Sequence, residues 1–485
     1  MEKKLKSYFG IDFGTTSSAT VGYMVMDNHT PEEFLYGDDE GRPIPSVVAI
    51  DEKTGEVFTG REAWDKKMQL SESCKYISSV KTILAEDRSY NIAGKEWNPV
   101  DIAAELFKAL KTQVKERTGV DLKSSTVAIP VGFSAEKRKK LRMAAHKAGI
   151  NIENFISEPT AAFFANYEEL RSSSIVVVFD WGGGTLDVSV LRNENGRISE
   201  LSTVGNDVAG DCIDEKIARR MHAKIARKKG KEITFDDMPA SAKDLMLVKA
   251  ERAKRALGDD DTATISINNY GPYGACREII DYDWFADIVA PEVKMAMDCL
   301  KKAIDQSGVG LGNIDRIVMV GGSSNLGPLL DKMEDVYEDK LYFPEETMWN
   351  VGQGAARLDM TPGNYCSNQS VGIVLSDNKY FELLSPNTEL DHWSNECHFG
   401  IVDTDKEARF IFGGSPDIDE SPEKFKVLPV PAYRFLQEKI GVKAFVDNDM
   451  VFRVEARSSM RPKEYKRVWE YSQLKCYYKL PEKRS

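Results

Sequence analysis

Residues 8–18 of the chain read Tyr-Phe-Gly-Ile-Asp-Phe-Gly-Thr-Thr-Ser-Ser, and residues 175–187 read Ile-Val-Val-Val-Phe-Asp-Trp-Gly-Gly-Gly-Thr-Leu-Asp. Each stretch begins with an apolar run that predicts a strand, and it continues with an aspartate, a bulky residue and a tight turn of glycine and threonine. A second apolar run follows each turn, at 19–26 and at 186–191. Because internal similarity of this kind indicates a duplicated fold, we expect two related halves that face each other across a cleft.

Helices alternate with further strands in the region that holds both stretches. Apolar residues recur at helical spacing over 101–118, and a basic helix is expected over 135–148. A glycine follows each of these segments, which is typical of a helix end. Continuous apolar runs at 125–130 and 314–320 predict buried strands. Strands that alternate with helices indicate an α/β fold class.

The composition changes near residue 360. Residues 359–370 are polar and contain proline and glycine, so we interpret them as a linker. Short alternating segments follow, and they predict a small all-β domain. These segments are 371–375, 380–384, 408–412, 441–446 and 450–456. The predicted organisation is a nucleotide-binding domain at 1–358, the linker at 359–370 and a β-domain at 371–485.

The overall composition is that of a globular protein, since 42% of the 485 residues are hydrophobic and 29% are charged. Lys and Arg number 65 against 77 Asp and Glu, and 65 − 77 = −12, which argues against a nucleic-acid binder. No stretch reaches the roughly 20 apolar residues of a membrane helix, and the first residues lack the apolar core of a signal peptide. Seven scattered cysteines without a C-x-x-C motif indicate reduced thiols. We therefore expect a cytoplasmic protein with neither nucleic-acid nor membrane partners.

The two turns of glycine and threonine carry the strongest functional signal. The chain has no G-x-x-x-x-G-K-[ST] motif, so it is not a P-loop NTPase. A turn of this composition exposes several backbone N–H groups that suit phosphate oxygens, and glycine allows close approach without a Cβ clash. An aspartate at the strand end can hold Mg²⁺ through its water shell. Two such turns predict a site that clamps a polyphosphate and its metal, with Asp12 and Asp180 as the metal-binding carboxylates.

The two turns and three further stretches resemble those of a known family, the 70-kilodalton heat-shock chaperones of the DnaK type, within the actin and sugar-kinase ATPase superfamily. The matching stretches appear in family order within residues 7–358. They are 10–18, 156–162, 180–187, 251–257 and 318–324. The resemblance implies a duplicated actin-like ATPase fold, with two lobes around a nucleotide. It also implies a small β-sandwich at the C-terminal end, which resembles the family's peptide-binding domain more loosely.

The resemblance implies a role for each matching residue. Lys81 would position the attacking water and stabilise the transferring phosphoryl group, while Glu158 and Asp187 would orient water and relay its proton. Asp12 and Asp180 would order the water shell of Mg²⁺. The implied catalytic residues are Lys81, Glu158, Asp187 and Thr185. The implied nucleotide-binding residues are Gly14, Thr15, Thr16, Gly182, Gly183, Gly184, Glu251, Lys254, Arg255, Gly321, Gly322 and Ser323.

Some positions depart from the family pattern. Asn325, Met348 and Gly258 stand where the family carries residues of the base pocket, so we expect weaker ATP affinity or looser base selectivity. The segment 359–370 lacks the family's acidic, leucine-rich linker, which puts coupling between the domains in question. We also expect no helical lid after the β-domain, and hence a short member of the family that releases peptide quickly.

The resemblance implies ATP, ADP and Mg²⁺ as ligands. As partners it implies client polypeptides, a J-domain co-chaperone and a nucleotide exchange factor. The first hypothesis is therefore an ATP-driven chaperone in which slow hydrolysis controls peptide binding. The main alternative is a nucleotide-sensing scaffold with little turnover. An actin-like filament ATPase and a metabolite kinase are further alternatives.

Overall fold

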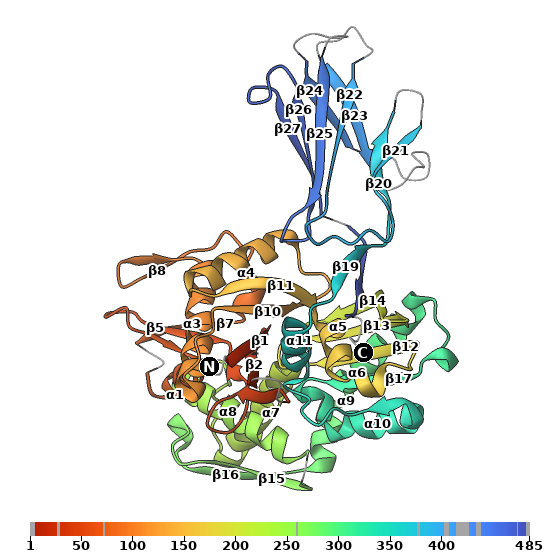
Figure 1. The fold of residues 1–485 in the computed structure, drawn as a ribbon. Helices are drawn as coiled ribbons and strands as arrows, with labels where there is room; N and C mark the ends of the chain where they lie inside the picture. The colour runs from red at the N-terminus through yellow and green to blue at the C-terminus, as the bar shows by residue number, and fades with distance from the viewer. Residues whose placement is uncertain are drawn as a thin grey trace. The chain divides into compact units, whose positions relative to one another are not determined.

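The computed structural model describes residues 5–481 except 27–29, 71–72, 259, 376–378, 402–406, 414–425, 433–437 and 473. The chain forms two compact units. The first contains Met1–Phe133, Lys140–Asn193 and Glu200–Thr361, and the second contains Ser134–Lys139, Glu194–Ser199 and Pro362–Ser485. The fold class is mixed α/β, as Figure 1 shows. Among the described residues, no helix is both long enough and apolar enough to cross a membrane.

The first sheet of the first unit has the strand order β11-β10-β1-β2-β3, and β4 pairs with β2. β1 and β2 form an antiparallel hairpin, whereas β10 runs parallel to β1 and β11 runs parallel to β10. The bounds are β1 Leu5–Phe13, β2 Ser17–Met26, β3 Glu32–Tyr36, β4 Ile44–Pro45, β10 Ser124–Ile129 and β11 Asn151–Ser157. The predicted strand that ends near Asp12 therefore lies in the centre of a sheet.

A second sheet repeats this order as β18-β17-β12-β13-β14. β12 and β13 form an antiparallel hairpin, and β17 runs parallel to β12. The bounds are β12 Ile175–Trp181, β13 Leu186–Glu194, β14 Arg197–Asn206, β17 Arg316–Val320 and β18 Leu341–Tyr342. Asp12 and Asp180 are each the last residue but one of the first hairpin strand. The repeated order therefore gives both aspartates the same place in their sheets.

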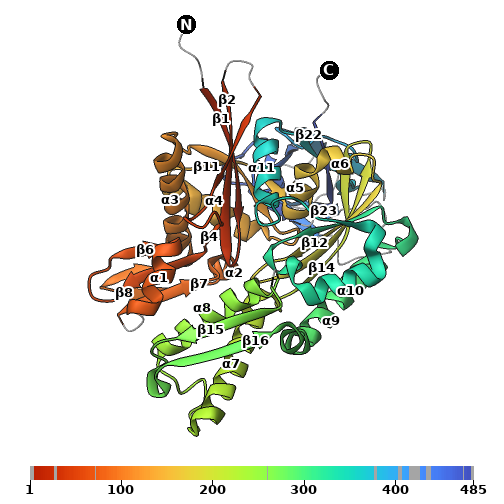
Figure 2. The same cartoon turned by 90° about the horizontal axis from the view of Figure 1, so that it is seen from below.

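Helices cover both faces of the first sheet. Figures 1 and 2 place α3 and α11 on opposite sides of the β1–β2 hairpin. α3 packs through Phe107, which stacks on Phe13 at a centroid distance of 4.8 Å. A capping box at Asn98 starts α3, and Gly119 ends it with a φ of 70°. The bounds are α3 Pro99–Thr118, α4 Ala135–Lys147, α5 Glu158–Ala165 and α11 Asn350–Met360.

α11 crosses β1 and α5 so closely that only glycine fits at the contacts. A Cβ at Gly10 would lie 2.1 Å from the backbone nitrogen of Ala356, and one at Gly354 would lie 1.8 Å from the carbonyl oxygen of Ala161. The last turn of α11 is fixed as well, because Asp359 accepts hydrogen bonds from the Phe9 backbone at 3.0 Å and from Thr126 at 2.9 Å. α11 thus holds β1 and α5 in one register.

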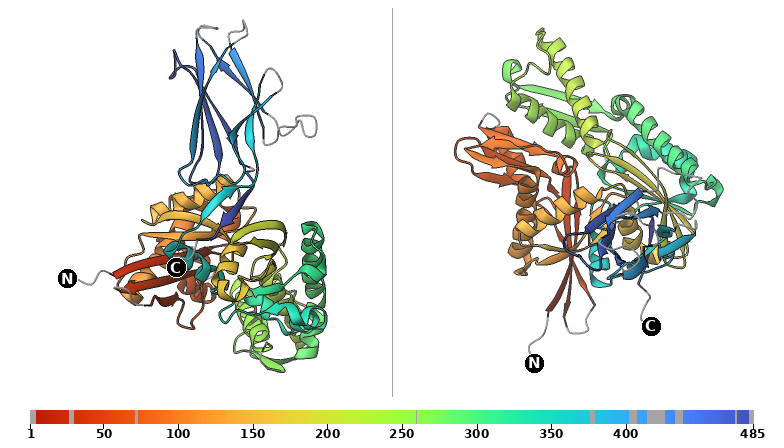
Figure 3. Two further views of the ribbon diagram at one scale, coloured as in Figure 1. Left: turned by 45° about the vertical axis from the view of Figure 1, so that its right-hand side comes forward. Right: turned by 90° about the horizontal axis from the view of Figure 1, so that it is seen from above.

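The second sheet packs on a large core with four helices and a hairpin. Figure 3 shows α7, α8 and the β15–β16 hairpin side by side in green. The bounds are α7 Gly210–Lys229, α8 Ala240–Ala256, β15 Thr262–Ile267, β16 Cys276–Asp281, α9 Tyr282–Ser307 and α10 Gly327–Tyr337. The smaller elements of the first unit are β5 Val47–Asp51, β6 Val57–Thr59, α1 Gly60–Leu70, β7 Cys74–Ser78, α2 Val80–Ile83, β8 Tyr90–Ile92, β9 Lys95–Trp97 and α6 Tyr167–Leu170.

Two four-stranded sheets share one core in the second unit. Their orders are β21-β20-β23-β24 and β22-β25-β26-β27. Phe412 of the first sheet stacks on Trp469 of the second at a centroid distance of 4.8 Å. The bounds are β20 Val371–Val374, β21 Tyr380–Leu384, β22 Ser394–Gly400, β23 Glu407–Gly413, β24 Lys426–Pro431, β25 Lys439–Val446, β26 Phe452–Ser458 and β27 Lys466–Tyr471.

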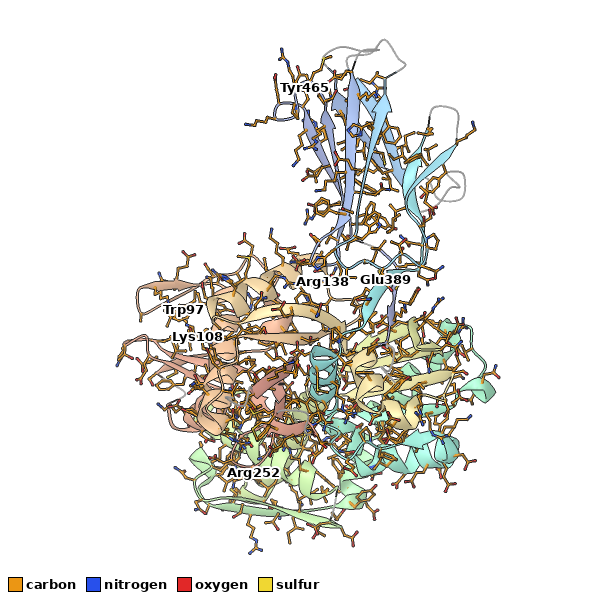
Figure 4. All side chains as sticks on the ribbon, in the orientation of Figure 1. Trp97, Lys108, Arg138, Arg252, Glu389 and Tyr465 are labelled. Atoms are coloured by element: carbon orange, nitrogen blue, oxygen red, sulfur yellow. The ribbon has the colours of Figure 1, made fainter. Side chains whose placement is uncertain are left out.

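The segment interpreted as a linker carries regular structure that its composition does not predict. Asp359 and Met360 end α11, and β19 spans Asn364–Ser367. β19 pairs with β28 (Cys476–Lys479), and β28 pairs with the first two residues of β14. Lys479 lies 3.1 Å from Glu389, which Figure 4 labels. The strand partner comes from more than 100 residues further along the chain, so local sequence cannot reveal it.

The crossing of α11 and α5 yields a stability prediction. Gly354→Ala forces the two backbones apart, and we expect a loss of about 1–3 kcal/mol or more in the free energy of unfolding. Gly312→Ala is the matched control, because a Cβ there meets no heavy atom within 4 Å. Urea unfolding followed by circular dichroism measures both. Equal stability of the two variants would contradict the close crossing.

Candidate functional site

The two turns of glycine and threonine touch each other. A Cβ at Gly183 would lie 2.7 Å from Cγ2 of Thr16, and one at Gly184 would lie 2.8 Å from Cγ2 of Thr15. Gly14 is equally constrained, because a Cβ there would lie 2.0 Å from the carbonyl oxygen of Ser17. Gly183 and Gly184 therefore allow two hairpin turns from different sheets to meet, whereas Gly14 allows the first turn to fold back on Ser17.

Four carboxylates and one lysine gather beside these turns. Asp180 and Asp187 face each other across the β12–β13 hairpin, and Asp12 occupies the matching place in β1. Glu158 is the first residue of α5. The Nζ atom of Lys81, on α2, lies 2.6 Å from Oε1 of Glu158, and these two side chains are only 7% and 12% exposed. If all four carboxylates were ionised, the group would carry a net charge of 1 − 4 = −3.

Burial and mutual repulsion raise the pKa of the aspartates. Burial and then Glu158 raise the pKa of Asp12 to about 7, although Lys81 opposes them. The same two causes raise the pKa of Asp187 to about 6, and the pKa of Asp180 lies well above its ordinary value. Burial opposes the charge of Lys81, but Glu158 and Asp12 outweigh it and raise the lysine pKa. The group therefore lacks positive charge, which fits a bound cation.

The geometry bears on how a metal could be held. Within the described part of the chain, no three His, Cys, Asp or Glu side chains come close enough together to ligate a metal ion directly. Asp12 and Asp180 stay the predicted metal residues, and the resemblance implies that they hold Mg²⁺ through its water shell. Mg²⁺ suits that arrangement because it gives up its water shell reluctantly.

A small cavity of about 10 Å³ adjoins the carboxylates, with room for about one water molecule. Glu158, Asp180 and Asp187 line it, together with the hydroxyl residues Ser189 and Thr203. The two hydroxyls hydrogen-bond to each other at 3.0 Å. The predicted catalytic acids Glu158 and Asp187 thus border one small cavity, whose remaining wall is largely apolar.

A second group of predicted residues packs around the β12–β13 turn. Lys254 donates to the Gly210 carbonyl at 3.1 Å and lies 2.8 Å from Asp214. Ser323 donates to the Gly182 carbonyl at 2.8 Å. A Cβ at Gly321, where φ is 85°, would lie 2.6 Å from the carbonyl oxygen of Trp181. The nearest atoms to such a Cβ at Gly322 belong to Met348, at 3.9 Å.

Sequence reasoning missed the carboxylate partner of Lys254. Burial raises the pKa of Asp214 to about 7 even though the nearby lysine opposes the shift. Burial outweighs the ion pair here, because both side chains are almost inaccessible to water. Asp211 was missed as well, and it accepts a hydrogen bond from Thr16 at 3.0 Å. Both aspartates lie in the first turns of α7, where alternating polar residues look like an ordinary helix surface.

Glu251 and Arg255 lie apart from the carboxylate group. They form an ion pair with each other on α8. Burial and then Arg255 lower the pKa of Arg42, which places that arginine near the pair. Arg61 contacts Asp38 at 3.0 Å in the same region. Nothing in the local sequence of residues 38–61 distinguishes these charged residues from those of a solvated loop, so they could not be predicted from the sequence.

The three positions that we predicted to alter the base pocket lie close to Glu251 and Arg255. Asn325 donates to the Thr347 hydroxyl at 3.1 Å, and the Met348 side chain is 38% exposed. A Cβ at Gly258 would lie 3.2 Å from the Arg255 carbonyl oxygen and 3.9 Å from that of Asn325. The three positions are therefore neighbours of the predicted nucleotide-binding residues.

Comparison with known proteins gives the family. The model of the Hsp70 protein family matches residues 86–356, which is more than half of the chain. The chain belongs to the Hsp70 family. The expected resemblance is therefore confirmed, and membership supports a chaperone-type ATP-binding protein. The matched residues include Glu158, Asp180 and Asp187, whereas Asp12 and Lys81 precede them.

Two relatives show how far the likeness extends. The chain is 26% identical over 475 residues to a chaperone protein DnaK of Halobacterium salinarum, which covers 92% of this chain and 72% of the relative. It is 29% identical over 417 residues to a chaperone protein DnaK of Metamycoplasma hominis, which covers 81% of this chain and 67% of the relative. The likeness to both includes part of the second unit as well as the first.

The raised pKa of Asp12 predicts how stability depends on pH. The folded chain holds this proton more tightly than the unfolded chain, whose aspartate keeps the ordinary value of 3.8. Ionisation therefore weakens the fold as the pH rises from that value to about 7. Asp12→Asn removes this penalty, so we expect its melting temperature to gain a few degrees on the wild type between about pH 5 and pH 8, without nucleotide or Mg²⁺.

Asp51→Asn is a control for which we expect the opposite effect on thermal stability. Backbone hydrogen bonds from Thr54 and Lys53 lower the pKa of Asp51, so its charge stabilises the fold above the ordinary value. Removing that charge should cost stability at every pH in this range. Thermal melts of the three proteins measure both effects, and a pH-independent gap between Asp12→Asn and wild type would contradict the raised pKa.

Proposed function

We propose that this chain is a slow Mg-ATPase whose nucleotide cycle controls polypeptide binding. In this proposal residues 1–358 form a two-lobe, actin-like ATPase domain, residues 359–370 join the domains, and residues 371–485 form a β-sandwich for substrate. The repeated strand order of the two sheets supports the duplicated fold. The gathering of four carboxylates and Lys81 beside two glycine-rich turns is the observation that carries the activity.

The two turns would bind the phosphates. Backbone N–H groups of Gly14 and of residues 182–184 would donate to phosphate oxygens, and the hydroxyls of Thr15, Thr16 and Thr185 would add donors. When bound, Mg²⁺ would supply positive charge that offsets the phosphate oxygens, and Asp12 and Asp180 would hold its water molecules. The turns touch each other, so we expect a small separation of the hairpins when a triphosphate enters.

Three side chains would act on the reacting groups. Lys81 stays protonated because its pKa is raised, so it can stabilise charge on the transferring phosphoryl group. Glu158 fixes that lysine at 2.6 Å and would orient the attacking water. Asp187 has a pKa of about 6, close to neutral pH, which suits a group that accepts a proton from water. The Thr185 hydroxyl bonds to Asp187 and opposes a larger rise of this pKa.

The nucleoside end would use Glu251, Lys254 and Arg255 for ribose and base. Gly321, Gly322 and Ser323 would let the backbone approach the nucleotide. Lys254 is held rigidly by Gly210 and Asp214, which supports a preformed contact point. The partners that we propose are client polypeptides, a J-domain co-chaperone and a nucleotide exchange factor, in the cytoplasm.

Lys81→Ala tests the chemistry. We expect kcat for ATP hydrolysis to fall by about 100-fold or more, because phosphoryl transfer depends on fixed positive charge. ATP affinity should change much less. Lys111→Ala is the matched control, because this lysine of α3 donates to the Gly149 carbonyl and pairs with Asp121 at 3.5 Å, and neither partner belongs to the proposed site. Turnover in Lys81→Ala equal to that of the control would refute the role assigned to Lys81.

Thr185→Ala should slow turnover more modestly than Lys81→Ala, by about 10-fold.

A nucleotide-sensing scaffold is the second candidate. Two side chains predicted to face the nucleotide are instead bonded to protein groups, because Thr16 donates to Asp211 and Arg255 pairs with Glu251. Phosphate release measured with and without an unfolded polypeptide separates the two candidates. The chaperone proposal predicts that polypeptide raises the ATPase rate. A rate near zero that polypeptide does not change, together with tight ATP binding, would favour the scaffold.

A further inference from the structure

Glu200 carries a carboxyl group that the proposed mechanism does not use. It lies on β14, and its Oε1 atom contacts the hydroxyl of Ser157 and, at 3.4 Å, that of Thr160. The two hydroxyls also lie 2.8 Å from each other, and both residues are buried. Three oxygen atoms from β14 and the start of α5 therefore form a closed triangle.

The two shorter contacts of this triangle account for both hydroxyl protons. The Ser157 hydroxyl donates to Glu200, so the 2.8 Å contact between the two hydroxyls takes its proton from Thr160. The 3.4 Å contact is longer than an ordinary hydrogen bond between two oxygens. Glu200 is therefore the acceptor at the end of a chain of two hydrogen bonds that orders both hydroxyls.

The triangle of oxygen atoms includes the N-cap residue of α5, the helix whose first residue is Glu158. Ser157 is the N-cap of α5, and its Oγ accepts a hydrogen bond from the Thr160 backbone at 3.3 Å. Glu158 follows it directly and reaches Lys81 at 2.6 Å. Any shift of the N-cap would move Glu158, because the two residues are joined by one rigid peptide unit.

The same strand also reaches the other side of the proposed site. Thr203 of β14 lines the small cavity with Glu158 and Asp187. Gly205 of β14 comes so close to Asp187 that a Cβ there would lie 2.9 Å from its Oδ1 atom. β14 thus contacts the helix that carries Glu158 and the carboxylate of Asp187 within six residues.

We propose that Glu200 is a positioning residue that fixes the N-cap of α5 through the Ser157 hydroxyl and thereby holds Glu158 against Lys81. The role rests on the proposed ATPase function, because Glu158 is a catalytic residue only in that reaction. It concerns kcat and not nucleotide affinity, since Glu200 contacts neither predicted phosphate-binding turn among the contacts of the described residues.

Three variants test the proposal by steady-state ATP hydrolysis. Glu200→Ala should lower kcat by about 10-fold or more and leave KM nearly unchanged, as losses of positioning groups do. Glu200→Gln should keep most of the rate, because its amide oxygen can still accept the hydrogen bond from the Ser157 hydroxyl. Ser202→Ala is the control on the same strand, where it removes a hydrogen bond to Ala303 of α9 and leaves α5 untouched. It should keep the wild-type kcat.

The outcomes separate this proposal from the proposed function. If the wild type hydrolyses ATP and Glu200→Ala keeps its kcat, or if Glu200→Gln fails as badly as Glu200→Ala, the positioning role is overturned. Amide hydrogen exchange gives a readout that needs no turnover. We expect the Thr160 amide, which donates to the Ser157 hydroxyl oxygen, to exchange faster in Glu200→Ala than in the wild type and in Ser202→Ala. Unchanged exchange in Glu200→Ala would overturn the positioning role even in a chain without ATPase activity.

Discussion

The close contact of Lys81 and Glu158 among three further carboxylates is the constraint on which the first unit depends. Like charges repel, and burial removes the water that would screen them, so four acids around one lysine are unfavourable at neutral pH. The scaffold around them is correspondingly tight. α11 locks β1 and α5 together through glycine contacts, and two hairpin turns meet where only glycine fits. The carboxylates repel each other, while the backbone around them is tightly packed. A cation that enters with a nucleotide would relieve this repulsion without a large change of the fold.

The two sheets explain how one chain builds such a site from distant segments. Each sheet carries an aspartate as the last residue but one of its central hairpin strand, and a turn that can expose N–H groups follows the strand. Because the strand orders match, Asp12 and Asp180 come from equivalent positions. The remaining acids enter from the neighbouring strand of the second hairpin and from the start of α5. The site therefore follows from the topology, and side-chain contacts such as that of Glu200 refine it.

Patterns of apolar residues predicted the hairpins, α3 and the central strands well, because those elements are buried on a regular face. β16 was not predicted, since Glu278 occupies one of its buried positions and is neutralised by Lys224 and Lys228. β22 was missed because none of its side chains is fully buried. β19 and β28 stabilise each other across a long stretch of sequence. The sequence predicted the two turns of the candidate site, because glycine and aspartate mark them. Asp214, Arg42 and Glu200 could not be predicted, because their contacts with the site residues form only in the folded chain.

Calorimetric titration with ATP tests the central claim most directly. Wild type would be measured with and without Mg²⁺, in two buffers that differ in ionisation enthalpy. We expect binding to be much tighter with Mg²⁺ and to release protons near pH 7, because the cation favours ionised Asp12 and Asp180. Binding that is equally tight without Mg²⁺, or that releases no protons, would contradict the view that this group of carboxylates exists to hold a metal-bound nucleotide.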